Sequence, residues 1–136
     1  MSVARIPGLV VIAALAASCG DTPTTPTATA TSPVTASFSS QLSVKGTSSR
    51  SFTVPSRGSV TVMLSAISPS GTVVGLGVGI PRANGSGCLL TTSVETTAAS
   101  SPQLAIEAAP GEYCAQIFDL GTLTDPISFT VAIVHP

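Results

Sequence analysis

The stretch SFTVPSRGSVTVML, residues 51–64, decides the fold class. Apolar side chains occupy every second position on both sides of a Pro-Ser-Arg-Gly break, at Phe52, Val54, Val60, Val62 and Leu64. Successive side chains of a β-strand point to opposite faces, so this pattern predicts two half-buried strands joined by a turn. A helix would need apolar residues at every third or fourth position instead.

The same pattern continues to the end of the chain. Short alternating or apolar runs are separated by clusters of Gly, Pro, Asn and Ser, which favour turns. The predicted strands are 36–44, 51–54, 59–64, 72–80, 88–94, 103–108, 112–118 and 127–134. No helical stretch links them, which excludes parallel β/α units. The spacing predicts an all-β domain of about eight strands over residues 36–136, either a sandwich or a barrel. We expect an antiparallel β-sandwich, Ig-like or jelly-roll-like, the jelly-roll form being what a family resemblance of three of its segments implies.

Composition narrows the class of protein. Hydrophobic residues make up 43% of the chain and charged residues only 8%, whereas disordered chains combine low hydrophobicity with high net charge. Beyond residue 18 the basic side chains are Lys45, Arg50, Arg57 and Arg82. Phosphate backbones are bound by clustered Lys and Arg, so we expect no nucleic-acid partner.

The N-terminus reads as an export signal over residues 1–18. Arg5 precedes an apolar run, Ile6 to Ala17, that is shorter than the ~20 residues a membrane span requires. The segment Leu15 to Cys19 resembles the bacterial lipobox, in which small residues precede a cysteine. The resemblance implies that Cys19 becomes the mature N-terminus and carries acyl chains such as palmitate in the lipid bilayer. The alternative is a secreted protein cleaved after Ala16, which would leave Cys19 as a free thiol.

The cysteine count favours lipidation over a free thiol. Three cysteines are present, and two lie within the predicted domain, so Cys19 has no partner for a disulfide. Cys88 and Cys114 are predicted to form a disulfide that staples the domain, because an exported compartment permits oxidation. The alternative is two separate buried thiols. A bridge that closes a loop of this length contributes about 3.5 kcal/mol in the chain-entropy model.

Residues 19–35 are expected to form a disordered tether. This Thr- and Pro-rich segment has no apolar periodicity, so it cannot contribute to a core. Extended at ~3.1 Å per residue, it would reach roughly 45 Å from the lipid surface. In envelopes with two membranes, an Asp directly after the lipidated cysteine resembles an inner-membrane retention signal. Here Gly20 holds that position and Asp21 follows it, so we expect the outer membrane.

Three segments of the domain resemble the bacterial pre-peptidase C-terminal (PPC) domain family. They are residues 51–64, the stretch PGEYCAQI at 110–117, and the closing strand at 127–133. The resemblance implies a jelly-roll-like sandwich on secreted or surface proteins, where such domains usually accompany a catalytic module and some bind collagen or polysaccharide. This chain has no catalytic module, and glycines stand where the family often has acidic residues, so the family's calcium site is not carried over.

The sequence contains no recognisable constellation of catalytic residues. His135 is expected to be exposed near a frayed terminus rather than catalytic. The pairs Glu107–Glu112 and Asp119–Asp125 flank turns, where carboxylates solubilise the surface, and calcium would require six or more oxygen ligands. We therefore expect no enzyme, no metal and no cofactor.

One strand suggests a partner surface. Gly75, Gly77 and Gly79 alternate with Val74, Leu76, Val78 and Ile80, which are expected on the opposite face. A strand face without side chains allows close approach of another backbone or a flat ligand; the alternative is a bulge or close packing between sheets. Together these features predict a non-catalytic envelope lipoprotein, either a binding or accessory module for an envelope protein or polysaccharide, or a purely structural protein.

Overall fold

A computed structural model describes residue 20, residue 23 and residues 31–136 of the chain. The predicted signal peptide, Cys19 and most of the predicted tether lie outside the described residues. The described part contains no helix long and apolar enough to cross a membrane.

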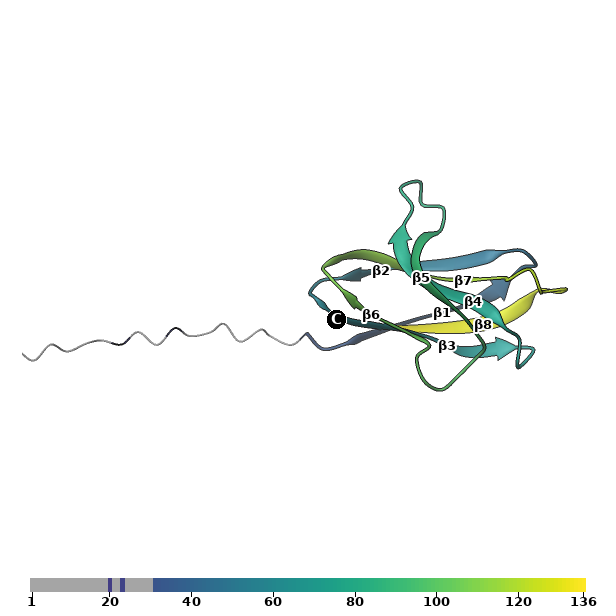
Figure 1. Cartoon of the computed structure of the whole chain (residues 1–136), viewed down its shortest axis with the longest axis horizontal. Helices are drawn as coiled ribbons and strands as arrows, with labels where there is room; N and C mark the ends of the chain where they lie inside the picture. Colours follow the sequence, from purple (N-terminus) through teal and green to yellow (C-terminus); the bar gives the residue numbers. More distant parts are fainter. Residues whose placement is uncertain (1–19, 21–22, 24–30) are drawn as a thin grey trace, which may run out of the picture.

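The domain is an all-β sandwich of two four-stranded sheets, which confirms the predicted class (Figure 1). Its strands are β1 (Val34–Leu42), β2 (Thr47–Val54), β3 (Gly58–Ser68), β4 (Val74–Pro81), β5 (Cys88–Thr96), β6 (Leu104–Ala108), β7 (Gly111–Phe118) and β8 (Ile127–His135). One sheet has the order β1-β8-β3-β6 and the other β2-β7-β4-β5. The first strand begins at Val34, two residues before its predicted start.

The connectivity is that of a jelly roll. Strands pair in nested fashion along the chain: β1 with β8, β2 with β7, β3 with β6 and β4 with β5, all antiparallel. Two further antiparallel pairings, β3 with β8 and β4 with β7, complete the sheets. A long hairpin folded over on itself produces this order.

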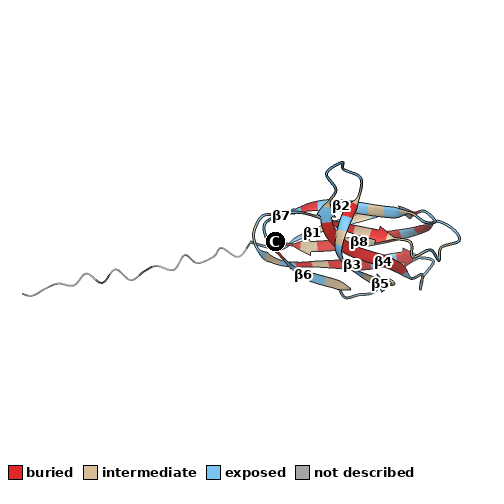
Figure 2. Cartoon of the chain, turned by 45° about the horizontal axis from the view of Figure 1, so that its top comes forward, coloured by how far each residue is buried: buried red, intermediate tan, exposed pale blue. Residues whose placement is uncertain are grey.

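The core lies between the two sheets and is almost entirely aliphatic (Figure 2). Each strand contributes alternate residues to it, as the period-two pattern predicts. The largest fully buried side chains are Leu42, Val54, Val60, Val62, Leu64, Val74, Leu76, Val78, Cys114, Ile117, Val131 and Ile133. Aromatic packing adds Phe38, whose ring meets that of Phe129 edge to face at a centroid distance of 5.6 Å.

A β-bulge keeps the long strand β3 in phase with the core. Leu64 pairs with Val131 and Ala66 with Thr130, so Ser65 is an extra residue. Without this residue, the side chain of Ile67 would point to solvent, because faces alternate every residue. With it, Ile67 is buried.

Side chains complete the pairing where ladders end. The ladder between β3 and β6 stops at Val62 and Leu104. One residue earlier, the carboxamide of Gln103 accepts a hydrogen bond from the Leu64 N–H at 2.9 Å and donates one to the Leu64 carbonyl at 3.2 Å. It also donates to the Thr97 carbonyl at 3.0 Å. Gln103 thus satisfies the backbone of β3 with its side chain.

Candidate binding surface

The predicted disulfide is present. Cys88, at the start of β5, and Cys114, in β7, are bridged with their Cα atoms 5.9 Å apart. Both are buried, and both project from the side of their sheet that faces away from the core. The backbone N–H of Cys88 donates to the side-chain oxygen of Gln116 at 3.2 Å, which holds the start of β5 beside β7. The bridge therefore links the two neighbours of β4.

The glycines of β4 do not form an open partner surface, which corrects the expectation from the sequence. All three are buried. A Cβ on Gly75 would overlap the ring of Phe118, one on Gly77 would come within 2.7 Å of the Leu90 side chain, and one on Gly79 would overlap the carbonyl oxygen of Leu89. The absent side chains make room for β5 and β7 of the same chain, close to a register shift between Val78 and Gly79. Of the two alternatives, the bulge is present between β4 and β5, but the close contacts come from β5 and β7 of the same sheet rather than from packing between sheets.

The hairpin between β4 and β5 projects from the sandwich (Figure 1). Ile80 and Leu89 are opposite each other at its base and are 52% and 57% exposed. The sequence pattern places Ile80 on the core face with Val78, but β4 runs past the end of the core there. Pairing of β4 with β7 ends at Gly79, so Ile80 is paired only with Leu89 of β5, within the projecting hairpin.

The outer face of the other sheet carries no charge across three neighbouring strands. None of β1, β3 and β8 contains Asp, Glu, Lys or Arg. Their outward-facing residues align in four rows across the sheet. We call this set the neutral face: Thr35, Ser37, Ser39, Gln41, Thr61, Met63, Ala66, Ser68, Ser128, Thr130, Ala132 and Val134. All twelve side chains are exposed or half-buried.

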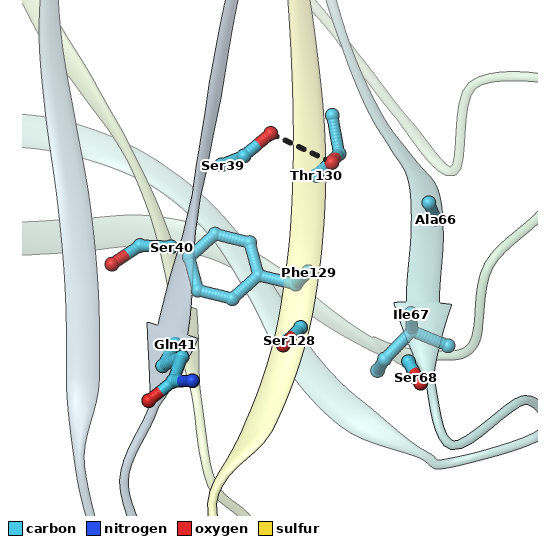
Figure 3. Close-up of a pocket in the computed structure, with 9 residues that line it drawn as sticks. All are labelled: Ser39, Ser40, Gln41, Ala66, Ile67, Ser68, Ser128, Phe129 and Thr130. Atoms are coloured by element: carbon cyan, nitrogen blue, oxygen red, sulfur yellow. Dashed lines mark hydrogen bonds between the residues drawn. The ribbon is translucent and has the colours of Figure 1, made fainter.

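A shallow groove of about 660 Å³ occupies one end of the neutral face. Figure 3 shows its two rows, with Ser39, Thr130 and Ala66 beside Gln41, Ser128 and Ser68. The hydroxyls of Ser39 and Thr130 are 2.7 Å apart and hydrogen-bonded. The groove therefore offers hydroxyl and amide groups and small side chains, with no ionised group to desolvate.

His135 is buried, so the expectation that it would be exposed near a frayed terminus was wrong. It pairs with Val34 inside the first sheet, so the end of β8 is held rather than frayed. Its ring stacks on Phe52 at a centroid distance of 5.2 Å, and Phe52 in turn stacks on Tyr113 at 6.0 Å. The Tyr113 hydroxyl donates to the Ala109 carbonyl at 2.8 Å. The three rings of His135, Phe52 and Tyr113 therefore pack against one another.

Asp119 organises a loop instead of merely solubilising it. One carboxylate oxygen accepts a hydrogen bond from the Lys45 backbone N–H at 2.7 Å. The other accepts from the backbone N–H groups of Gly121, Thr122 and Leu123 at 2.9, 3.1 and 3.1 Å. Partial desolvation raises the pKa of Asp119, but these four donors outweigh it, and the pKa lies below its ordinary value. The contact joins the β7–β8 loop to the β1–β2 turn.

Within the described residues, no group of three or more His, Cys, Asp or Glu side chains is arranged to hold a metal ion. Compared with protein-family models and with curated proteins, the chain gives no match. The neutral face extends across three of the four strands of its sheet.

Proposed function

We propose that this protein is a non-catalytic lipoprotein of the bacterial cell envelope whose jelly roll binds an envelope protein through the neutral face. The neutral face is the observation that carries the binding role. Charged residues make up about 25% of typical soluble domains, and interface centres are depleted of charge because ions are costly to desolvate. The twelve uncharged side chains that lie together across three strands share this lack of charge with an interface centre.

A protein partner is favoured over a polysaccharide. Carbohydrate sites usually present an aromatic ring on which a sugar stacks, and none of the exposed large hydrophobic residues in the described part is aromatic. Phe52 and Phe129 are buried, and the ring of Phe118 lies over Gly75. Small hydroxyl side chains suit close packing against another protein surface. The resemblance to the PPC family supports an accessory role on an exported protein.

The location rests on the sequence. The apolar segment before Cys19 and the lipobox-like residues 15–19 support lipidation, and Gly20 supports the outer membrane where two membranes exist. Two or more acyl chains hold a protein stably in a bilayer, whereas one does so marginally. The test is the intact mass of the chain purified from membranes. Lipidation predicts an N-terminal Cys19 with added acyl mass; a chain that begins at Ala17 without it would identify a secreted protein.

The binding role is tested with detergent-solubilised full-length chain immobilised on beads. Envelope fractions are passed over the wild type, a variant with Ala66→Glu and Ser68→Glu in the neutral face, and a control with Ser93→Glu, an exposed position on the opposite sheet. We expect retention by the wild type and the control, at least tenfold less by the double variant, and loss after protease treatment of the fraction. Protease-resistant retention would indicate a polysaccharide, and no retention would favour a purely structural lipoprotein.

A further inference from the structure

The two sheets expose four edge strands: β1 and β6 in one, β2 and β5 in the other. An edge strand presents unpaired N–H and C=O groups, and proteins protect such edges with charges, bulges or short strands. β6 has five residues and carries Glu107, β2 carries Arg50, and β5 carries Glu95 and a register shift against β4. β1 has nine residues and contains no charge and no proline. It is therefore the unprotected edge of the domain.

No other segment in the described part of the chain pairs with the outer edge of β1. The backbone hydrogen bonds outside the ladders involve no residue of β1. Phe38 points toward the core from this edge and packs against Phe129, but it remains half-buried. An added strand would satisfy the free backbone groups and cover more of Phe38.

We propose that β1 pairs antiparallel with β1 of a second copy of this chain, so that two domains form one continuous eight-stranded sheet. A two-fold axis perpendicular to the sheet makes the contact self-complementary. With the axis near Phe38, Ser37 lies opposite Ser39 of the partner subunit. When a strand pairs with its own copy, a charged residue on the axis faces the same charge in the partner, which is unfavourable. β1 has no charge at any position, so it can pair with its copy in any register without opposing like charges, whereas Arg50 in β2 and Glu95 in β5 restrict the register.

The symmetry and the chain length are compatible with two copies in one membrane. The axis places both neutral faces on the same side of the joined sheet, because residues directly opposite each other share a face. The two copies of Val34 then lie about 27 Å apart, at ~3.4 Å per residue. The chain between Cys19 and Val34 could extend roughly 45 Å. This last step rests on the proposed lipid anchor, whereas the strand pairing does not.

The test uses two full-length copies co-expressed with different tags, followed by purification through one tag and detection of the other. Ser37 and Ser39 are both exposed, so lysines there should leave the fold intact. When both copies carry Ser37→Lys and Ser39→Lys, opposed lysines should reduce co-purification about tenfold. When one copy carries the lysines and the other carries Ser37→Glu and Ser39→Glu, co-purification should return to the wild-type level.

The matched control places lysines on an edge of the opposite sheet, as Ser49→Lys and Ser51→Lys in β2. It should co-purify like the wild type, and circular dichroism of every variant should show the wild-type β-sheet signal. Absence of wild-type co-purification would overturn the proposal. So would equal co-purification of the lysine pair, or failure of the glutamate copy to restore it. The neutral-face variants on β3 keep β1 unchanged, so they test partner binding without altering the strand that self-pairs. Ser37 and Ser39 belong to the neutral face as well, so the mixed lysine–glutamate pair, which keeps that face charged, is the measurement that assigns the loss to self-pairing.

Discussion

The ring of Phe118 lies over Gly75, the residue directly opposite it in the β4–β7 ladder. The aromatic side chain fills the space that a side chain on β4 would occupy. Two positions on, Gly77 lies beneath the Leu90 side chain, and Gly79 lies beneath the backbone of Leu89. A side chain added at each glycine would thus meet a ring, an aliphatic side chain or a backbone carbonyl, so the three substitutions should lower stability by different amounts.

Gly79→Ala should destabilise the domain far more than Gly75→Ala. At Gly79 a methyl group meets a backbone carbonyl, so the hairpin itself must shift, and we expect a loss of about 3 kcal/mol. At Gly75 the obstacle is the end of a half-buried side chain that can rotate away, and alanine is favoured over glycine in a strand by ~0.5–1 kcal/mol. Gly75→Ala should change stability by about 1 kcal/mol or less. Urea unfolding of both variants checks this, and equal losses would contradict it.

Reduction of the Cys88–Cys114 bridge should lower the free energy of unfolding by about 3.5 kcal/mol, because the unfolded chain regains the freedom of a 26-residue loop. Urea titrations with and without reductant measure the change. The variant Cys88→Ala/Cys114→Ala should resemble the reduced wild type and respond to reductant no further. A double variant as stable as the oxidised protein would show that the bridge does not contribute.

Gln103→Leu should cost about 1–3 kcal/mol. The leucine cannot accept a hydrogen bond from the Leu64 N–H, and leaving this part-buried group without that partner incurs its desolvation penalty. The Leu64 carbonyl loses one of two donors and keeps the Ala99 N–H at 3.0 Å. Gln103→Glu should also destabilise at neutral pH, because a carboxylate cannot donate to the carbonyls of Leu64 and Thr97. Gln41→Leu, an exposed position on β1, is the matched control and should change stability by less than about 0.5 kcal/mol. Chemical denaturation of the three variants distinguishes these effects.

Asp119 should make stability depend on acid pH. Its pKa in the folded state lies below the unfolded value of about 3.9, so the ionised form favours folding. This contribution is fully present above pH ~4–5 and is lost as the pH falls through the folded pKa. Asp119→Asn should lower the melting temperature at neutral pH and flatten its decline in acid. The control is Asp125→Asn. The Asp125 carboxylate accepts a hydrogen bond only from the neighbouring Thr124 hydroxyl, so this variant should keep the wild-type fall of the melting temperature in acid.

The strands were predictable because their signal is local. Alternation in residues 51–64 identifies β2 and β3 without knowledge of any partner, and the disulfide follows from compartment and cysteine count. What the sequence could not show was how distant strands meet. Ile80 continues the alternation of core-facing residues in β4, but it lies past the last residue that pairs with β7 and is exposed. His135 is buried because it pairs with Val34, about a hundred residues earlier. The alternating glycines of β4 could not show which side chains occupy the space beside them, since Phe118 and Leu90 come from other strands.

The neutral face was also recoverable in principle. The absence of charge in β1, β3 and β8 is visible in the sequence. Only the jelly-roll order makes these three strands neighbours, since β1 and β3 are separated by β2 along the chain and by β8 in the sheet. The nested pairing therefore converts scattered uncharged strands into one surface.

The position of β1 also determines how the domain would carry mechanical load. The chain enters the sandwich at Val34 and runs along β1 to Leu42, with a nine-pair ladder to β8 beside it. A pull on Val34 against a contact at the far end of the sandwich would act along the strand and stress all nine pairs in shear together. A pull between Val34 and His135 would instead separate the pairs one after another from that end. The direction of pulling, more than its size, would decide whether the domain holds.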